Sequence, residues 1–198
     1  MLGFVFFLYS LSPVLPFLDD GRSLILLRIG DGVTPPSIAT QLYPVFIEEW
    51  STTPQGYSGP NPWSLTLLNA PWALISTTAV DPSRCRVRGD AFYTNLQLSR
   101  SANNRYLTFG CADPSDVTDK RRTVVRVNWN TTLEYTVFTM PVASFPLTDV
   151  ISVTGNEYWV TSAGVSFGTY YLTHGGSTPV AIRTSAGYSD MTVYKAPR

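Results

Sequence analysis

Hydrophobic and polar positions alternate with a period of two in short runs along this chain, and the clearest group spans residues 95–138. Alternation of this kind, rich in β-branched and aromatic residues and interrupted by Asn, Ser and Thr, is typical of short strands joined by turns. The pattern predicts strands at residues 95–98, 105–109, 123–129 and 133–138. Because these strands follow one another closely, we expect them to form one antiparallel four-stranded sheet.

The rest of the chain shows further short strand patterns. The apolar run at residues 23–29 predicts a buried strand that ends in a tight turn at Gly30, since glycine adopts positive φ readily. Further strands are predicted at residues 44–50, 63–67, 73–76, 157–161, 169–172, 179–182 and 191–194. No stretch predicts an amphipathic helix or a coiled coil with comparable strength. The predicted fold class is therefore all-β.

The turn and strand around Asn104 recur later in the chain. Residues 103–108 (NNRYLT) match residues 155–161 (GNEYWVT), with a spacing of 52 residues counted from Asn104 to Asn156. This spacing is close to the roughly 50-residue period of kelch-type propeller blades. The alignment places Trp159 at the position of Leu107 and predicts that Trp159 belongs to the core.

Several motifs resemble a family of secreted repeat-type β-propellers that occurs in bacteria, algae and plants and mostly lacks an assigned activity. The resemblance begins with residues 26–32 (LLRIGDG) and 44–50 (PVFIEEW). It continues through residues 98–101 (LSRS), 105–107 (RYL), 124–127 (VVRV), 157–160 (EYWV) and 175–178 (GGST). The resemblance implies a ring of about seven blades in a chain nearly twice as long as this one.

We therefore expect a partial β-propeller of about three four-stranded antiparallel blades, with a β-sandwich as the alternative. The expected organisation is a lead-in segment at residues 1–22 and a propeller domain at residues 23–198, with blades at 23–76, 87–138 and 147–194. Half a ring leaves two blade faces uncovered. We expect those faces to include Val125, Val127, Tyr158 and Val160, and we expect self-association if the chain is half a propeller. A compact monomer would instead favour the sandwich.

Composition narrows the range of partners. The chain has 198 residues, of which 44% are hydrophobic and only 14% are charged, and 14 basic residues balance 14 acidic ones. A neutral chain offers no electrostatic reason to bind nucleic acid or an anionic membrane surface. Basic residues do gather at residues 84–88, where we expect Arg84, Arg86 and Arg88 to share one strand face, and at residues 120–122. Both clusters are interpreted as solvated.

The N-terminal segment predicts export. Residues 2–18 carry no charge and are mostly apolar, but Pro13 and Pro16 interrupt the run, which makes it a poor membrane-spanning helix. An apolar stretch followed by small residues is typical of a secretory signal peptide. The alternatives are a buried first strand or a mis-set start codon. We predict a secreted protein with no membrane span in the mature chain.

Two features fit an extracellular location. Cys85 and Cys111 are the only cysteines, and in an exported chain they predict one disulfide. Two buried thiols in a cytosolic protein are the alternative. Asn130 begins an N-glycosylation sequon on a predicted hairpin turn.

Candidate chemistry is sparse. The single histidine, His174, has no cysteine, carboxylate or second histidine near it in sequence, which predicts an exposed turn residue and excludes a histidine-based metal cluster. Glu48 and Glu49 are neighbours on a strand, so their side chains point to opposite faces and cannot act as one acid–base pair. The phosphate-loop, calcium-loop and nucleophile-elbow motifs are absent from the sequence. We predict no catalytic residue, no metal and no cofactor.

The five tryptophans have two interpretations. Most lie at strand ends, where aromatic side chains pack in a core. Trp63 and Trp72 flank a proline-rich segment, and they are the candidates for stacking on sugar rings.

The favoured function is a secreted, non-enzymatic β-propeller that acts as an extracellular binding or structural module. Its partner would be an extracellular protein or a carbohydrate. Two alternatives stay open: a fragment of an extracellular carbohydrate-active propeller enzyme, and an intracellular kelch-like adaptor. The adaptor predicts reduced cysteines and no glycan.

Overall fold

The structure is a computed structural model that describes residues 23–30, 42–51, 74–88, 97–115, 120–128, 132–141, 147–162 and 168–184. The expected leader at residues 1–22 lies outside the described residues, as do the predicted strands at 63–67 and 191–194. Trp63, Trp72 and Asn130 also lie outside them.

Within the described residues the chain forms strands, turns and bends and contains no helix, so the predicted all-β class is confirmed. The strands are β1 (Ser23–Ile29), β2 (Leu42–Tyr43), β3 (Val45–Ser51), β4 (Leu74–Ala79), β5 (Val87–Arg88), β6 (Ser99–Arg100), β7 (Tyr106–Ala112), β8 (Arg121–Asn128), β9 (Leu133–Thr139), β10 (Leu147–Ile151), β11 (Glu157–Ser162), β12 (Gly168–Thr173) and β13 (Val180–Thr184).

The strands form three larger antiparallel sheets and one small one. Their orders are β1-β3-β4, β6-β7-β8-β9, β10-β11-β12-β13 and, for the two-stranded sheet, β2-β5. The four-stranded sheet predicted from residues 95–138 is confirmed, although its first strand is Ser99–Arg100 rather than residues 95–98. Strand β5 lies in the predicted second unit, yet it pairs with β2 from the first.

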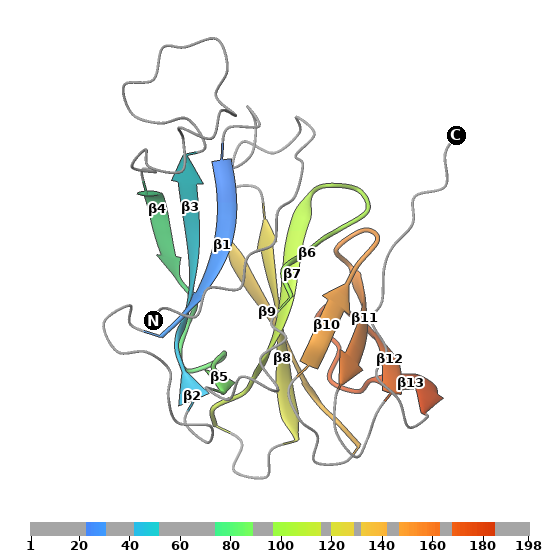
Figure 1. The fold of residues 1–198 in the computed structure, drawn as a ribbon. Helices are drawn as coiled ribbons and strands as arrows, with labels where there is room; N and C mark the ends of the chain where they lie inside the picture. The colour runs from blue at the N-terminus through green and yellow to red at the C-terminus, as the bar shows by residue number, and fades with distance from the viewer. Residues whose placement is uncertain are drawn as a thin grey trace.

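The central sheet, β6–β9, is covered on both faces (Figure 1). On β8, Val125 and Val127 belong to a hydrophobic cluster shared with β1 and β3, whereas Val124 belongs to a second cluster shared with β10, β11 and β12. Successive strand residues point to opposite faces. This explains why the run at 124–127 is apolar nearly throughout, as in strands that are buried on both sides.

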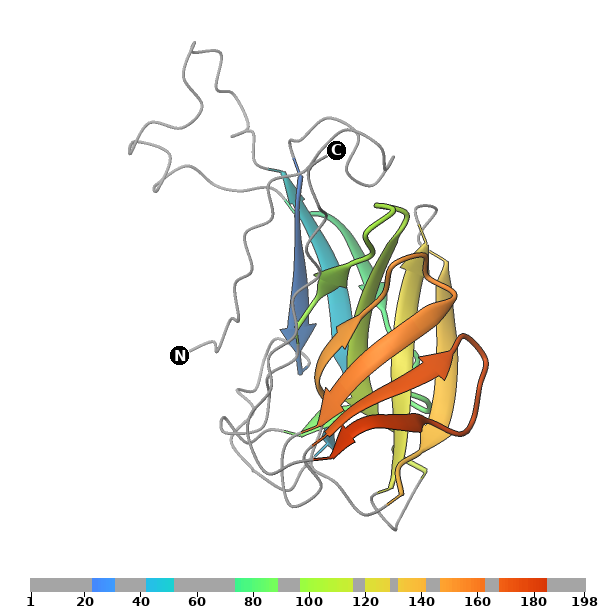
Figure 2. The ribbon, with the colours of Figure 1, turned by 90° about the vertical axis from the view of Figure 1, so that its right-hand side faces the viewer.

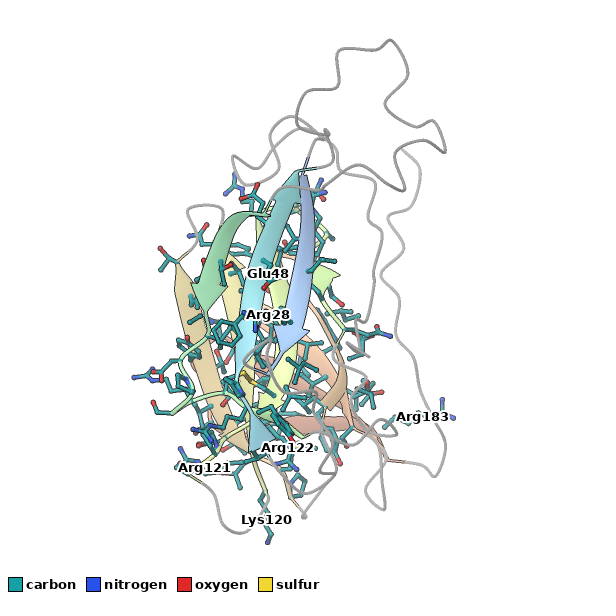
Figure 3. The ribbon with its side chains drawn as sticks, turned by 60° about the vertical axis from the view of Figure 1, so that its left-hand side comes forward. Arg28, Glu48, Lys120, Arg121, Arg122 and Arg183 are labelled. Carbon is teal, nitrogen blue, oxygen red and sulfur yellow. A yellow bond between two sulfur atoms is a disulfide. The ribbon has the colours of Figure 1, made fainter. Side chains whose placement is uncertain are left out.

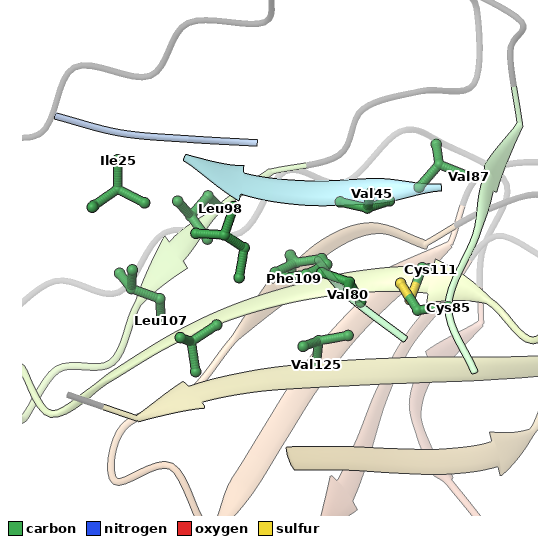
Figure 4. Packing of buried hydrophobic residues seen from close by; sticks show 12 residues of the cluster. Ile25, Val45, Val80, Cys85, Val87, Leu98, Leu107, Phe109, Cys111 and Val125 are labelled. Carbon is green, nitrogen blue, oxygen red and sulfur yellow. A yellow bond between two sulfur atoms is a disulfide. The ribbon is translucent and has the colours of Figure 1, made fainter. Parts of the chain in front are cut away.

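The first cluster fills the space between the β1-β3-β4 sheet and the central sheet (Figure 4). Phe109 on β7 and Val45 on β3 are both 0% exposed. The second cluster includes Tyr158 and Val160 on β11, also 0% exposed. The expectation that Val125, Val127, Tyr158 and Val160 form uncovered faces is therefore wrong, because the neighbouring sheets of the same chain bury them.

The two four-stranded sheets repeat with an offset of 51 residues rather than 52. Leu107 faces the preceding sheet from β7, and Tyr158 faces the preceding sheet from β11. The turns before these strands match at the same offset, since Ser101 and Ser152 each accept a backbone hydrogen bond through Oγ. Asn104 and Gly155 both have positive φ, at 61° and 87°.

The offset changes the assignment of Trp159. One residue of register moves a side chain to the other face of a strand. Trp159 is therefore half-buried on the outward face of β11, whereas its neighbours Tyr158 and Val160 occupy the core. The prediction that Trp159 belongs to the core at the position of Leu107 is wrong for this reason.

Gly155 allows the two repeat turns to approach closely. A Cβ atom at this position would lie 2.2 Å from the Tyr106 ring, and φ is in the region that favours glycine. The turn at residues 101–105 also bonds directly to the segment 152–154, because the amides of Ala102 and Asn103 donate to Ser152 O and Val153 O at 3.1 and 3.0 Å. The corresponding turns of successive sheets thus hold each other.

Candidate functional site

The two cysteines form a disulfide in the first hydrophobic cluster (Figure 4). Their Cα atoms are 5.4 Å apart, and both side chains are buried. Cys85 lies in the segment before β5 and Cys111 lies in β7, so the bond joins the connection between two sheets to the central sheet. The predicted pairing is confirmed.

The basic clusters differ from their predicted solvated form (Figure 3). Arg84 lies in a turn rather than on a strand face, 3.5 Å from a carboxylate oxygen of Asp81 and over the ring of Tyr135. Arg121 is exposed and pairs with Asp113 at 3.0 Å. Arg122, in contrast, is 1% exposed, because β8 is covered on the face to which it points.

The face of β3 opposite the first cluster carries a buried ion pair. The Arg28 guanidinium donates to Glu48 Oε1 and to Gly30 O, and it lies 4.1 Å from the centre of the Phe46 ring (Figure 3). Glu48 is buried and Glu49 is half-buried on the other face, as the strand alternation predicts. The pair therefore ties β1 to β3.

A polar cluster lies between the central sheet and the β10–β13 sheet, and we call it the junction cluster. It consists of Arg126 from β8, Glu134 and Thr136 from β9, Tyr158 from β11 and His174 from the turn after β12. These residues are far apart in sequence and meet only because the two sheets pack face to face.

Arg126 is the cationic centre of the junction cluster. Its Nη1 donates to Gly155 O at 2.5 Å and to Asn156 Oδ1 at 3.2 Å, and its Nη2 donates to Glu134 Oε2. The guanidinium also lies 4.6 Å from the centre of the Tyr106 ring. A buried arginine needs such partners because an unpaired buried charge is costly. Arg126 thereby links β9 to the turn before β11.

His174 links the same two sheets through both ring nitrogens. Its Nε2 lies 3.2 Å from Glu134 Oε2, and its Nδ1 lies 2.8 Å from the Tyr158 hydroxyl and 3.1 Å from Thr136 Oγ1. A carboxylate only accepts, so Nε2 carries the proton and Nδ1 accepts from a hydroxyl. The prediction of an exposed histidine without a carboxylate partner is wrong, because β9 brings Glu134 to it.

Burial sets the protonation of the junction cluster. It raises the pKa of the Tyr158 hydroxyl to about 12, so the phenol stays protonated and can donate. Burial, and after it the charge of Arg126, lower the pKa of His174 below the ordinary 6.5, although Glu134 acts in the opposite direction. The histidine is therefore neutral near pH 7, which fits the hydrogen-bond pattern.

The chain of Glu134, His174 and Tyr158 has the connectivity of a carboxylate–imidazole–hydroxyl relay. A nucleophile must reach a substrate and needs a base that activates it, but the Tyr158 side chain is 0% exposed and its raised pKa favours the phenol. The arrangement is suited to holding two sheets together. No local sequence signal reveals it, since each member lies on a different turn or strand face.

The junction cluster predicts a loss of stability in acid. Because the folded pKa of His174 is lower than the unfolded one, the unfolded chain takes up the proton first as the pH falls. The contribution is complete above the ordinary pKa of 6.5 and is lost as the pH falls toward the folded value.

This prediction is measured by thermal melts of the wild type and of His174→Gln between about pH 5 and pH 8. We expect the melting temperature of the wild type to fall more steeply in the acid part of this range than that of the variant. Parallel curves would contradict the assignment of a neutral buried histidine.

Two searches of the described residues bear on the kind of site. Among them, no three His, Cys, Asp or Glu side chains are grouped closely enough to hold a metal ion. The same residues include no helix with the length and hydropathy needed to cross a membrane. Comparison with protein-family models, curated proteins and solved structures finds no match to this chain. The class that the fold defines is thus an all-β protein of packed antiparallel sheets with one disulfide.

Proposed function

We propose that this chain is part of an extracellular β-propeller that serves as a non-enzymatic binding or structural module for a protein or carbohydrate partner. The observation that carries the proposal is the repetition of a four-stranded antiparallel sheet, β6–β9 and then β10–β13, with matching turns at a 51-residue offset. Each repeat of this size equals one propeller blade.

The way the sheets pack supports blades over a two-layer sandwich. In a sandwich of two sheets, each sheet buries one face against the other and exposes the second. Here the central sheet has hydrophobic clusters on both faces, with β1 and β3 on one side and β10 to β12 on the other. Successive blades of a propeller are covered in this manner.

The disulfide supports an extracellular location. Such bonds persist in oxidising compartments and are rare in the cytosol, where thiols are kept reduced. The Cys85–Cys111 bond lies in the core of the sheet stack, and the intracellular adaptor would require two free thiols instead. The apolar N-terminal segment and the sequon at Asn130 are consistent with export but lie outside the described residues.

The proposal is tested by expressing the chain with its own N-terminus in a secreting eukaryotic host. We expect protein in the medium, and we expect no thiol to react with iodoacetamide until the protein is unfolded and reduced. A Cys85→Ser/Cys111→Ser variant is the matched control, since it lacks the bond but keeps the rest of the chain. Retention inside the cell with two alkylated cysteines would refute the extracellular proposal.

A further inference from the structure

The outward face of the β10–β13 sheet carries a row of large apolar side chains that crosses all four strands. Ile151 pairs with Trp159, Trp159 with Tyr171, and Tyr171 with Val180. Residues that pair directly across antiparallel strands share a face. The rings of Trp159 and Tyr171 pack edge to face with centroids 5.4 Å apart, and Val180 is 59% exposed. We call these four residues the outer row.

The opposite face of the same sheet is already covered. Val150, Val160 and Tyr170, each adjacent to a member of the outer row, are buried in the cluster that faces the central sheet. Figure 2 shows β10–β13 as the front layer, with the central sheet behind it. The outer row is therefore a second apolar face on a sheet whose first face is buried by sheet packing.

The charges on this face favour a copy of the same chain as the occupant. The outer row itself carries no charge, so two copies can approach without repulsion. Beyond one end of the row lies Glu157, paired with Thr173, and beyond the other lies the exposed Arg183, paired with Thr169. A two-fold axis that runs across the strands places the acidic end of one sheet over the basic end of the other.

We propose that this face is a homodimer interface in which the outer rows of two copies pack against each other. Aromatic side chains at the centre with charges at the rim are the usual composition of such interfaces. The inference deepens the proposed function and rests on it, because it extends the same face-to-face packing of sheets to a second chain.

The test is sedimentation velocity of the purified full chain at concentrations from about 1 to 100 μM, a range over which a dimer of ordinary affinity dissociates or persists measurably. We expect the wild type to dimerise, and we expect Val180→Lys to weaken the dimer about tenfold or more. Val153→Lys is the matched control, since Val153 is also exposed, at 41%, but lies in the turn before β11. Arg183→Glu should weaken the dimer as well.

Two results would overturn the inference. One is a wild-type chain that sediments as a monomer across the whole range. The other is a dimer that Val180→Lys and Val153→Lys affect equally. Both lysine variants alter exposed positions, so their melting temperatures should match that of the wild type. A secreted, disulfide-bonded monomer would refute only the dimer, whereas a dimer with reduced thiols inside the cell would refute the extracellular proposal.

Discussion

Replacing Tyr158 with alanine is expected to cost about 3–5 kcal/mol of unfolding free energy, as other large-to-small changes of buried aromatic residues do. Tyr158 is 0% exposed, contacts the second hydrophobic cluster and donates to His174 Nδ1. The same change at the adjacent Trp159 is expected to cost clearly less, because that side chain is half-buried on the outward face. Urea unfolding of the two variants measures the difference.

The comparison of these neighbours tests the register of the repeat. At an offset of 51 residues Tyr158 occupies the position of Leu107, whereas at 52 residues Trp159 would occupy it. A more conservative variant, Tyr158→Phe, keeps the packing and removes only the hydroxyl, so it separates burial from hydrogen bonding. If Trp159→Ala were the more destabilising of the two alanine changes, the offset of 51 would be incorrect.

Replacing Arg126 with methionine is expected to cost about 2–4 kcal/mol, because removing one member of a buried ion pair leaves the other uncompensated. The variant leaves the Glu134 carboxylate and the Gly155 carbonyl without the guanidinium. The magnitude is kept below that of a fully buried pair because the Glu134 side chain is 31% exposed. Chemical unfolding at neutral pH provides the measurement.

Two controls make the Arg126 result specific. Arg105→Met changes an exposed arginine nearby, and it should alter stability by no more than about 0.5 kcal/mol. The double variant Arg126→Met/Glu134→Leu removes both charges, so it should lose less than the sum of the two single changes. The acid loss of stability should also shrink in Arg126→Met, since its charge helps to lower the pKa of His174. An additive double variant would show that the two side chains do not interact.

Much of the sheet structure could be predicted from the sequence because strand formation leaves a local pattern. The alternation at residues 105–109, 123–129 and 133–138 corresponds to β7, β8 and β9 with shifts of one to three residues at their ends. The turn at Gly30 was also predictable, and its φ is 90°. With only two cysteines in the chain, the pairing of Cys85 with Cys111 required no knowledge of the fold.

The faces of the strands depended on tertiary packing. Matching Tyr106 with Tyr158 by residue type gives an offset of 52, whereas the sheets superimpose Leu107 on Tyr158. Because side chains alternate with a period of two, this single residue exchanges core and outward positions along all of β11.

The polar core was likewise decided only by the tertiary structure. Arg122 and Arg126 belong to stretches that look solvated or merely strand-like in sequence, and they are buried because sheets pack on both faces of β8. Glu134 and His174 lie 40 residues apart, so no spacing rule joins them. Short-range alternation determines where strands form, whereas the stacking of sheets determines which charges must find partners between them.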